Sequence, residues 1–249
     1  MPTPPILAVR EASISFGAVR AVNGVSLALA PGERHALLGT NGAGKTTLFN
    51  AISGEVPLTS GGIAFKGSDI SRLRPHQRAR LGIGRTFQTS LTFADRSVED
   101  NLRVAVMGSR GPRFGLRPWG AYRPQVEAAR VSAARFGLDE VLAQPVGTLS
   151  YGQQRELEIA MALAGEPELL LMDEPAAGMS PQGRGRLVEI LRGLPRSITM
   201  LFVEHDMDVA LSLADRITVM RDGAVVAAGT PSDIRANPLV RELYLGGKH

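Results

Sequence analysis

The chain has 249 residues, 44% of them hydrophobic, which predicts one globular domain, or one domain with an inserted lobe, rather than a disordered chain. It contains no cysteine, and this excludes disulfides, thiolate metal sites and cysteine catalysis. The formal net charge of +4 permits phosphate, nucleic acid or an anionic membrane surface as a partner, whereas an aromatic content of 5% argues against stacking platforms for single-stranded nucleic acid.

The first third of the sequence predicts strands joined by turns, followed by a helix. Apolar and polar residues alternate in two segments, and a short apolar run then enters a glycine-rich loop. The expected elements are strands at 6–16, 25–30 and 35–39, turns at 23–24 and 31–32, and a helix at 46–53.

The middle of the sequence has helical periodicity, and the last third returns to an alternation of strands and helices. Ser97 followed by Asp100 is typical of a capping box that opens a helix, and residues 108–124, rich in Gly, Pro and Arg, indicate a loop. The expected helices are 97–107, 125–136, 153–164, 181–192 and 207–213, and the expected strands are 169–172, 198–203, 217–221 and 224–228, with helical turns to 245.

This order of elements predicts an α/β core interrupted by a mainly helical lobe at residues 89–160. No apolar stretch approaches the roughly 18 residues that a membrane-spanning helix needs. The N-terminus also lacks the pattern of a signal peptide. Any role at a membrane is therefore expected to come through a partner.

The first motif with chemical meaning is GTNGAGKT at residues 39–46, which matches the phosphate-binding loop G-x-x-x-x-G-K-[ST]. Glycines let the loop backbone turn its N–H groups toward phosphate oxygens, and the helix that follows adds its N-terminal dipole. Lys45 is expected to reach the β- and γ-phosphates, and the hydroxyl of Thr46 to bind Mg²⁺. The residues expected to bind ATP in this loop are Gly39, Thr40, Asn41, Gly42, Ala43, Gly44, Lys45, Thr46 and Thr47.

The second motif is LLLMDE at residues 169–174, in which four apolar residues end in two carboxylates. A buried parallel strand has this composition, and its carboxyl end lies at the edge of the sheet where ligands bind. We expect Asp173 to hold Mg²⁺ through water and Glu174 to orient and polarise the attacking water.

With these motifs in place, the sequence from Phe16 to near the C-terminus resembles the ATPases of ABC transporters. The segment LSYGQ, which comprises Leu149, Ser150, Tyr151, Gly152 and Gln153, resembles the signature sequence of that family, usually LSGGQ. The resemblance implies that Ser150 and Gly152 bind the γ-phosphate of ATP held by a second subunit. Tyr151 departs from the usual glycine.

Three further positions match the family, and a fourth departs from it. Gln88 takes the place of the Q-loop glutamine, which contacts Mg²⁺ and water and senses the transmembrane partner, and His205 that of the switch histidine, which contacts the γ-phosphate and the catalytic glutamate. Phe16 takes the place of the aromatic residue that stacks on adenine, although a core aromatic at a strand end is the competing interpretation. Ser180 replaces the usual aspartate of the D-loop, here residues 176–180, which puts the contact of this loop across the dimer in doubt.

The resemblance implies a P-loop NTPase fold, in which an ABC ATPase core carries an antiparallel β subdomain and an inserted helical subdomain. The core would comprise residues 1–88 and 161–249, and the helical subdomain with the signature residues 89–160. It further implies hydrolysis of ATP with Mg²⁺, by Glu174 with His205 and Gln88. Because the chain has one P-loop and one signature, a complete site would require a second ATPase subunit, either a copy of this chain or a paralogue.

Details of the motifs resemble the subfamily for branched-chain amino acid uptake. They include RTFQ at 85–88, the helix LSYGQQRELEIA at 149–160, DEPAAG at 173–178 and YLG at 244–246. The implied partners are transmembrane permease subunits and, indirectly, an extracytoplasmic substrate-binding protein, with no nucleic acid. The implied location is the cytoplasmic face of the inner or plasma membrane, peripheral through the permease.

Several alternatives remain open. Urea or short-chain amide importers and the lipopolysaccharide-export ATPase share this style of sequence. Some ABC ATPases act without any permease, but these usually carry two cassettes or long coiled-coil insertions. The arginines of loop 108–124 face either lipid headgroups and permease loops or only solvent.

Overall fold

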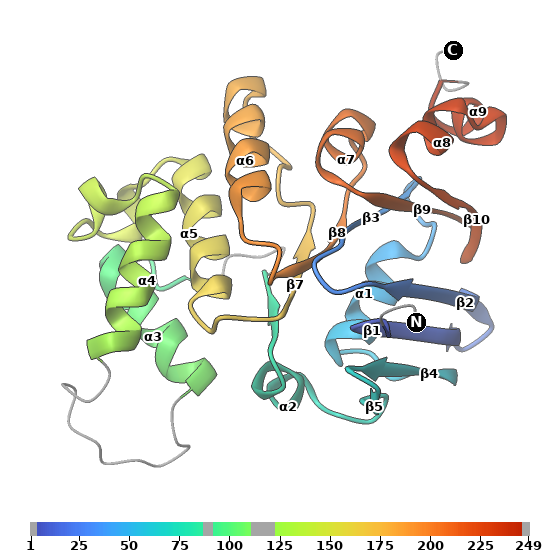
Figure 1. Ribbon diagram of the computed structural model, residues 1–249, viewed down its shortest axis with the longest axis horizontal. Coiled ribbons are helices and arrows are strands. Elements are labelled where there is room, and N and C mark those ends of the chain that lie inside the picture. Colours follow the sequence, from blue (N-terminus) through green and yellow to red (C-terminus); the bar gives the residue numbers. More distant parts are fainter. Residues whose placement is uncertain (1–3, 87–91, 111–122, 246–249) are drawn as a thin grey trace.

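Two β-sheets and the helices that pack around them organise the described residues, which are 4–86, 92–110 and 123–245 of this computed structural model (Figure 1). The smaller sheet has four antiparallel strands in the order β2-β1-β4-β5. Its strands are β1 (Leu7–Phe16), β2 (Val19–Leu29), β4 (Ser60–Phe65) and β5 (Ser68–Asp69).

The larger sheet has six strands in the order β10-β9-β3-β8-β7-β6. Only β10 is antiparallel to its neighbour, and the other five strands are parallel, as expected where helices connect successive strands. The strands are β3 (Arg34–Gly39), β6 (Ile83–Arg85), β7 (Leu169–Asp173), β8 (Thr199–Val203), β9 (Arg216–Arg221) and β10 (Ala224–Gly229).

The parallel strands are buried on both faces, which explains why their sequences are nearly continuous apolar runs. Alternate residues of one strand enter different cores, because successive side chains point to opposite faces. In β7, Leu169 and Leu171 pack against α1 and the antiparallel sheet, whereas Leu170 and Met172 pack against the helices of the opposite face. The described residues therefore form two hydrophobic cores with the parallel sheet between them.

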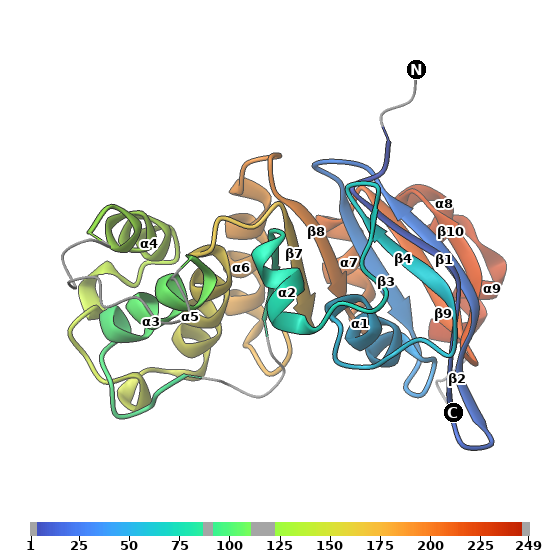
Figure 2. The same cartoon turned by 90° about the horizontal axis from the view of Figure 1, so that it is seen from below.

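The α-helices of the described ranges are α1 (Lys45–Ser53), α2 (Pro75–Arg80), α3 (Val98–Arg110), α4 (Arg123–Arg135), α5 (Tyr151–Leu163), α6 (Pro181–Gly193), α7 (Met207–Leu213), α8 (Pro231–Ala236) and α9 (Pro238–Leu245). Two short 3₁₀ turns, Asp139–Val141 and Val146–Thr148, precede α5. Helices α3, α4 and α5 pack on one another at one end of the molecule, away from the antiparallel sheet (Figures 1 and 2). The hydroxyl of Ser97 accepts a hydrogen bond from the N–H of Asp100 at 3.1 Å, which confirms the predicted start of α3.

The turn predicted at Asn23–Gly24 is wrong, because both residues lie inside strand β2. The hairpin turns instead at Gly17 and Ala18, between Phe16 and Val19. The pairing of β1 with β2 shifts register at residues 23–24, where the hydroxyl of Ser13 accepts from the N–H of Gly24 at 3.0 Å. A β-bulge thus takes up the glycine that otherwise favours a turn.

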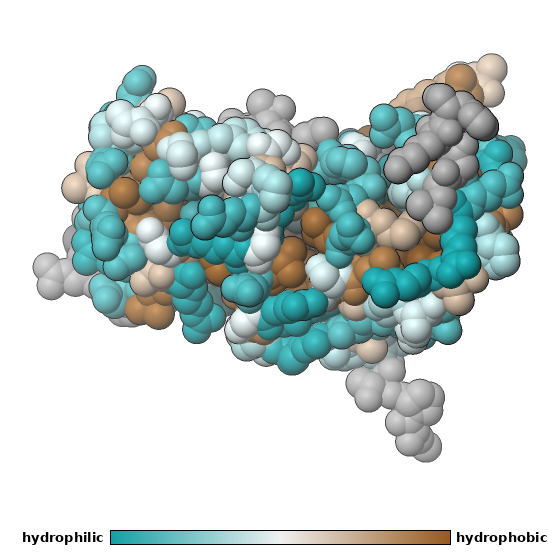
Figure 3. All heavy atoms as spheres, turned by 90° about the horizontal axis from the view of Figure 1, so that it is seen from above, coloured by the Kyte–Doolittle hydropathy of each residue, from teal (hydrophilic) through white to brown (hydrophobic). Residues whose placement is uncertain are grey.

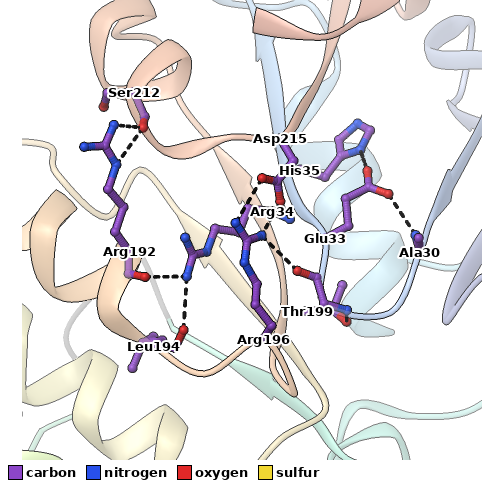
Figure 4. Close-up of polar contacts among 11 residues, drawn as sticks. Ala30, Glu33, Arg34, His35, Arg192, Leu194, Arg196, Thr199, Ser212 and Asp215 are labelled. Atoms are coloured by element: carbon purple, nitrogen blue, oxygen red, sulfur yellow. Dashed lines mark hydrogen bonds and ion pairs between the residues drawn. The ribbon is translucent and has the colours of Figure 1, made fainter.

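A polar network ties together the starting ends of the parallel strands, opposite the end that carries the phosphate-binding loop (Figure 4). The buried guanidinium of Arg34, at the start of β3, donates to the carbonyl oxygens of Arg192 at 2.6 Å and Leu194 at 3.1 Å. The backbone N–H of Arg34 donates to Asp215 at 2.8 Å, and Arg196 also pairs with that carboxylate. The C-terminal end of α6 and the residue before β9 are thereby fixed to β3.

None of the helices in the described part of the chain is long and apolar enough to cross a membrane. On the face shown in Figure 3, hydrophilic side chains predominate and hydrophobic areas lie between them.

Candidate functional site

The phosphate-binding loop lies between β3 and α1, at the carboxyl end of the parallel strands. Gly44 is the N-cap of α1 and has a φ of +91°. A Cβ at this position would lie 2.3 Å from the carbonyl oxygen of Ala21, so no other residue fits without moving β2. Gly44 also provides no side-chain cap, which leaves the first N–H groups of α1 available to a bound phosphate.

The backbone of the phosphate-binding loop holds the side chain of Lys45 over the loop. Its Nζ donates to the carbonyl oxygen of Gly39 at 2.7 Å and to that of Thr40 at 3.0 Å. Burial lowers the pKa of Lys45, and the carboxylates of Glu174 and Asp173 oppose that shift. A preorganised cation therefore faces the position at which the loop would hold phosphate oxygens.

Asp173 ends strand β7 near this lysine, and Glu174 is the next residue. The side chain of Asp173 is buried, and neither of its carboxylate oxygens has a hydrogen-bond partner among the described residues. Burial raises the pKa of Asp173, as does the charge of Glu174, whereas Arg85, Lys45 and Arg155 lower it. A buried carboxylate without partners is costly unless something binds it.

The donor set at this edge fits Mg²⁺. The described residues contain no group of three or more His, Cys, Asp or Glu side chains able to enclose a metal ion. Mg²⁺ commonly uses one or two protein oxygens together with waters and phosphates, so such an enclosure is not needed. Thr46, in the first turn of α1, and Asp173 at the end of β7 supply oxygen atoms of the kind that Mg²⁺ binds.

Glu174 has a left-handed backbone with a φ of +47°, which is uncommon for a residue other than glycine. Its N–H donates to the carbonyl oxygen of Val203 at 2.9 Å, which fixes the turn against β8. Its Oε1 lies 3.4 Å from Nδ1 of His205. The structure therefore brings together the predicted catalytic glutamate and the predicted switch histidine.

His205 is positioned by the residue that follows it. Asp206 caps α7 by accepting from the N–H groups of Asp208 at 2.9 Å and Val209 at 3.2 Å. Arg184 on α6 pairs with the other oxygen of Asp206 at 2.7 Å. This cap sets where the chain leaves β8 and hence where His205 stands.

Phe16 lies at the end of β1 and is 55% exposed, so it is not the core aromatic of the competing interpretation. Ala21, on the next strand, touches Gly44 of the phosphate-binding loop. The ring thus belongs to the same hairpin that borders the loop, as stacking on a base would require. Gln88 lies outside the described residues.

The signature segment stands apart from the loop. Ser150 caps α5 by accepting from the N–H of Gln153 at 3.3 Å, and the Gln153 side chain accepts from the N–H of Ser150 at 3.0 Å. A cavity of about 440 Å³ borders this helix start, and none of residues 39–47 lines it. Its lining comes from the signature, the D-loop and α6: Ser150, Tyr151, Gly152, Gln153, Glu156, Gly178, Met179, Ser180, Gln182, Gly183 and Arg186.

Sequence reasoning missed the structural role of Arg85, which it noted only as part of a motif. Its guanidinium donates to Ser53, donates to Asn50 at 2.8 Å, pairs with Glu55 at 2.9 Å, and lies 4.9 Å from the ring centroid of Phe49. Arg85 thus locks α1 to β6, directly before the segment with Gln88. The available signal was an arginine within an otherwise apolar strand end.

Glu204 was also missed. It follows the apolar strand β8, is 1% exposed, and lies beside His205. Its Oε1 is 3.5 Å from the N–H of Ala176, and burial raises its pKa to about 7. A carboxylate next to the predicted switch histidine was the signal that could have identified it.

Comparison with known proteins places this geometry in a family. The family model described as ABC transporter matches residues 22–177, and that of the branched-chain amino acid ATP-binding cassette transporter matches residues 224–249. The chain is 40% identical to the high-affinity branched-chain amino acid transport ATP-binding protein BraF of Pseudomonas aeruginosa, over 97% of this chain and 98% of that protein. It has the same identity and coverage with LivG, of the same description, from Escherichia coli.

Among solved structures, the fold is similar to an ATP-binding cassette of an ABC transporter in its ADP conformation. The TM-score is 0.85 at 28% identity, with 98% of this chain and 100% of the other covered. A nucleotide-free cassette of an ABC transporter has a TM-score of 0.82 at 29% identity, with 96% and 98% covered. ATP-binding subunits of this family work as dimers with membrane permease partners. The chain belongs to the ABC transporter family, as an ATP-binding subunit that hydrolyses ATP with Mg²⁺.

Proposed function

We propose that this subunit powers the import of branched-chain amino acids. The observation that carries the proposal is the 40% identity, over nearly the whole length of both chains, to proteins described by that transport. The match of residues 224–249 to the branched-chain amino acid family model supports it independently of the motifs shared by all ABC ATPases. The subunit works at the cytoplasmic face of the membrane, bound through permease subunits that a substrate-binding protein serves from outside.

The cargo is tested in the organism that carries the gene. Deletion is expected to abolish uptake of radiolabelled leucine, isoleucine and valine, and the intact gene, but not Glu174→Gln, to restore it. If uptake of these amino acids is unchanged and uptake of urea or short-chain amides is lost, the subunit powers a urea or amide importer instead. No feature of the described residues favours lipopolysaccharide export or a role without a permease.

The hydrolytic site works mainly by charge and position. Lys45 and the amides of the phosphate-binding loop bind the β- and γ-phosphates, and Thr46 and Asp173 hold Mg²⁺, which neutralises the charge of the transferred phosphoryl group. Glu174 orients the attacking water and accepts its proton. His205, at 3.4 Å from Glu174, holds that carboxylate toward the γ-phosphate.

Glu174→Gln is expected to lower the rate of ATP hydrolysis about 10²–10⁴-fold, because the amide retains the size of the side chain and loses the base. Steady-state phosphate release measures this loss, and binding of a fluorescent ATP analogue serves as the control for an intact nucleotide site. A rate within about threefold of the native rate would remove Glu174 from the proposed role.

A complete site spans two subunits, because the signature and the phosphate-binding loop of one chain are separate. The supporting observation is that the cavity beside Ser150 and Gly152 contains no residue of the loop at 39–47. We expect MgATP to convert Glu174→Gln from monomer to dimer in light scattering, since nucleotide bound between two chains is no longer hydrolysed. A protein that binds ATP and stays monomeric would contradict a site shared between two copies.

The permease contact belongs in the second cavity, of about 400 Å³, which lies between α2, β6, α3 and α5. Thr86 and Thr92, which border the segment containing Gln88, line it together with apolar side chains such as Ala105 and Met161. A hollow next to the predicted sensor of the transmembrane partner suits an apolar segment of that partner.

The same proposal divides the chain into a catalytic core and a helical subdomain. Residues 89–160 form the helical subdomain that carries the signature, and residues 1–88 and 161–249 form the catalytic core. The mutual packing of α3, α4 and α5 supports this division. Because α5 continues to Leu163 and is followed closely by β7, a movement of the subdomain would be transmitted directly to Asp173 and Glu174.

A further inference from the structure

The residue of the signature that differs from the usual family sequence, Tyr151, makes a contact within its own chain. Its hydroxyl donates to the carbonyl oxygen of Ala177, in the D-loop, at 3.1 Å. Helix α5, which Tyr151 begins, lies beside the segment that joins β7 to α6 (Figure 1). The signature and the D-loop are thus joined by a side chain that a glycine would not supply.

The D-loop is shaped to receive this ring. Gly178 has a φ of +73°, and a Cβ there would lie 3.0 Å from Cε1 and 3.2 Å from Cζ of Tyr151. The ring therefore occupies the space above a glycine, and substitution of Gly178 would displace it. The guanidinium of Arg155, one helical turn later, lies 6.0 Å from the ring centroid and pairs with Glu158 at 2.7 Å.

The contact continues to the catalytic glutamate. The N–H of Ala177, the residue that Tyr151 contacts, donates to the carbonyl oxygen of Glu174 at 3.1 Å. Glu174 is the residue with the left-handed backbone, whose conformation depends on the contacts around its turn. A short chain of hydrogen bonds thus connects the start of α5 with the turn that presents the base.

We infer that Tyr151 is a positioning residue that links the signature of a subunit to the Glu174 turn of the same subunit. The inference rests on the proposed two-chain site, in which the signature meets the nucleotide of the partner subunit. ATP bound at one site then sets the position of Glu174 at the other site through Tyr151. Hydrolysis at the two sites of the dimer is coupled through this contact.

Tyr151→Phe removes the hydroxyl and keeps the ring. We expect kcat for ATP hydrolysis to fall about fivefold, as the loss of one hydrogen bond allows, while the KM for ATP changes less than about twofold. Tyr151→Gly, which restores the usual family residue, is expected to lower kcat further. Val131→Ala, at an exposed position on α4, is the control for a substitution in the helical subdomain that touches neither segment.

Dimers in which only one site can hydrolyse ATP show whether Tyr151 acts on the site of its own chain or on that of its partner. Subunits with two different affinity tags are mixed, one of them carries Glu174→Gln, and the doubly tagged dimers are isolated with MgATP. Tyr151→Phe is then placed either in the subunit with the native Glu174 or in the Glu174→Gln subunit, whose signature faces the working site. The inference requires a kcat at least about threefold lower when Tyr151→Phe lies in the subunit with the native Glu174 than when it lies in the Glu174→Gln subunit.

An equal loss in both arrangements, a larger loss in the second, or no loss in either would overturn the inference, because Tyr151 would then act on the partner's nucleotide or not at all. If Glu174→Gln subunits bind ATP without dimerising, the proposed site shared between two copies of this chain fails, and the inference for that dimer fails with it. The two failures are distinguishable, since dimerisation is measured before any substitution of Tyr151.

Discussion

At the scale of single residues, Glu204 is the side chain whose ionisation bears most on stability. Burial raises its pKa from 4.5 to about 7, while the backbone of Ala176, the charge of His205 and the backbone of Asp206 oppose the shift. Because the folded state holds this proton more tightly than the unfolded state, the group's contribution to stability is fully present below about pH 4.5 and is lost as the pH rises through 7.

At pH 8, Glu204→Gln is therefore expected to have a free energy of unfolding up to about 3 kcal/mol higher than that of the native protein, because the amide is never charged. The difference should shrink steadily as the pH falls from 8 to 5. Chemical denaturation at several pH values measures it, with Glu189→Gln, an exposed position on α6, as the matched control. If the free energies of unfolding of the native protein and of Glu204→Gln depend on pH in the same way, the pKa of Glu204 is not raised.

Contiguous motifs in the sequence are sufficient to identify most residues of the candidate site. The loop at 39–47 and the acidic end of β7 depend only on neighbours in sequence, so their spacing carries the information. The contacts of Arg85, Glu204 and Tyr151 were not predictable in this way. Their partners lie 25 or more residues away, and only packing brings the two segments together.

At the scale of elements, the C-terminal end of α1 is capped by one buried arginine from α2. Arg78 is 2% exposed and donates to the carbonyl oxygens of Ala51 at 2.7 Å, Ile52 at 2.6 Å and Leu73 at 2.9 Å. Burial lowers its pKa to about 10, so it remains charged at neutral pH. Its hydrogen bonds add a donor at the end of the helix, where carbonyl groups lack intrahelical partners, although the carbonyl oxygen of Ala51 also accepts from the N–H of Gly54 at 3.2 Å.

Arg78→Met is expected to lower the free energy of unfolding by about 3 kcal/mol, because several buried carbonyl groups lose their donor at once. Arg80→Met, an exposed position on the same helix, should change it by no more than about 0.5 kcal/mol. Urea denaturation of the two variants compares them. Similar stabilities would show that water replaces the guanidinium without cost.

Element predictions succeeded where the apolar or helical pattern was clear, and no prediction was made where local sequence carries no such pattern. The apolar runs of β3, β7 and β8 and the helices α5, α6 and α7 are confirmed within a few residues. Residues 54–86 gave no prediction, although they contain β4, β5, α2 and β6. Strand β4 begins SGG and β6 has three residues, so their pairing with β1 and β7 supplies what local propensity does not.

At the scale of the whole molecule, the cavity between α2, β6, α3 and α5 is the proposed place of the permease. Gly108 on α3 lines it, and a side chain at this residue would meet open space, so Gly108→Arg should fold normally and fill the hollow with charge. We expect co-purification with the permease to be lost while hydrolysis by the isolated subunit persists. Val104→Arg, exposed on the same helix and outside the cavity, is the control.

Retained permease binding by Gly108→Arg would place that contact elsewhere on the subunit. Loss of binding by both variants would attribute the effect to added charge on α3 rather than to the cavity. Co-purification from detergent-solubilised membranes and phosphate release by the isolated subunit are measured on the same preparations.

The sequence by itself determined the chemistry of this protein and the order of its elements. A loop that binds phosphate, a strand that ends in two carboxylates and a helix capped by Ser150 are each written in a few consecutive residues. Tertiary structure alone decided which of these meet. Side chains of one strand divide between two cores, Asn23–Gly24 becomes a bulge, and Tyr151 reaches the turn after Glu174, because each outcome depends on surfaces that form only when distant segments pack.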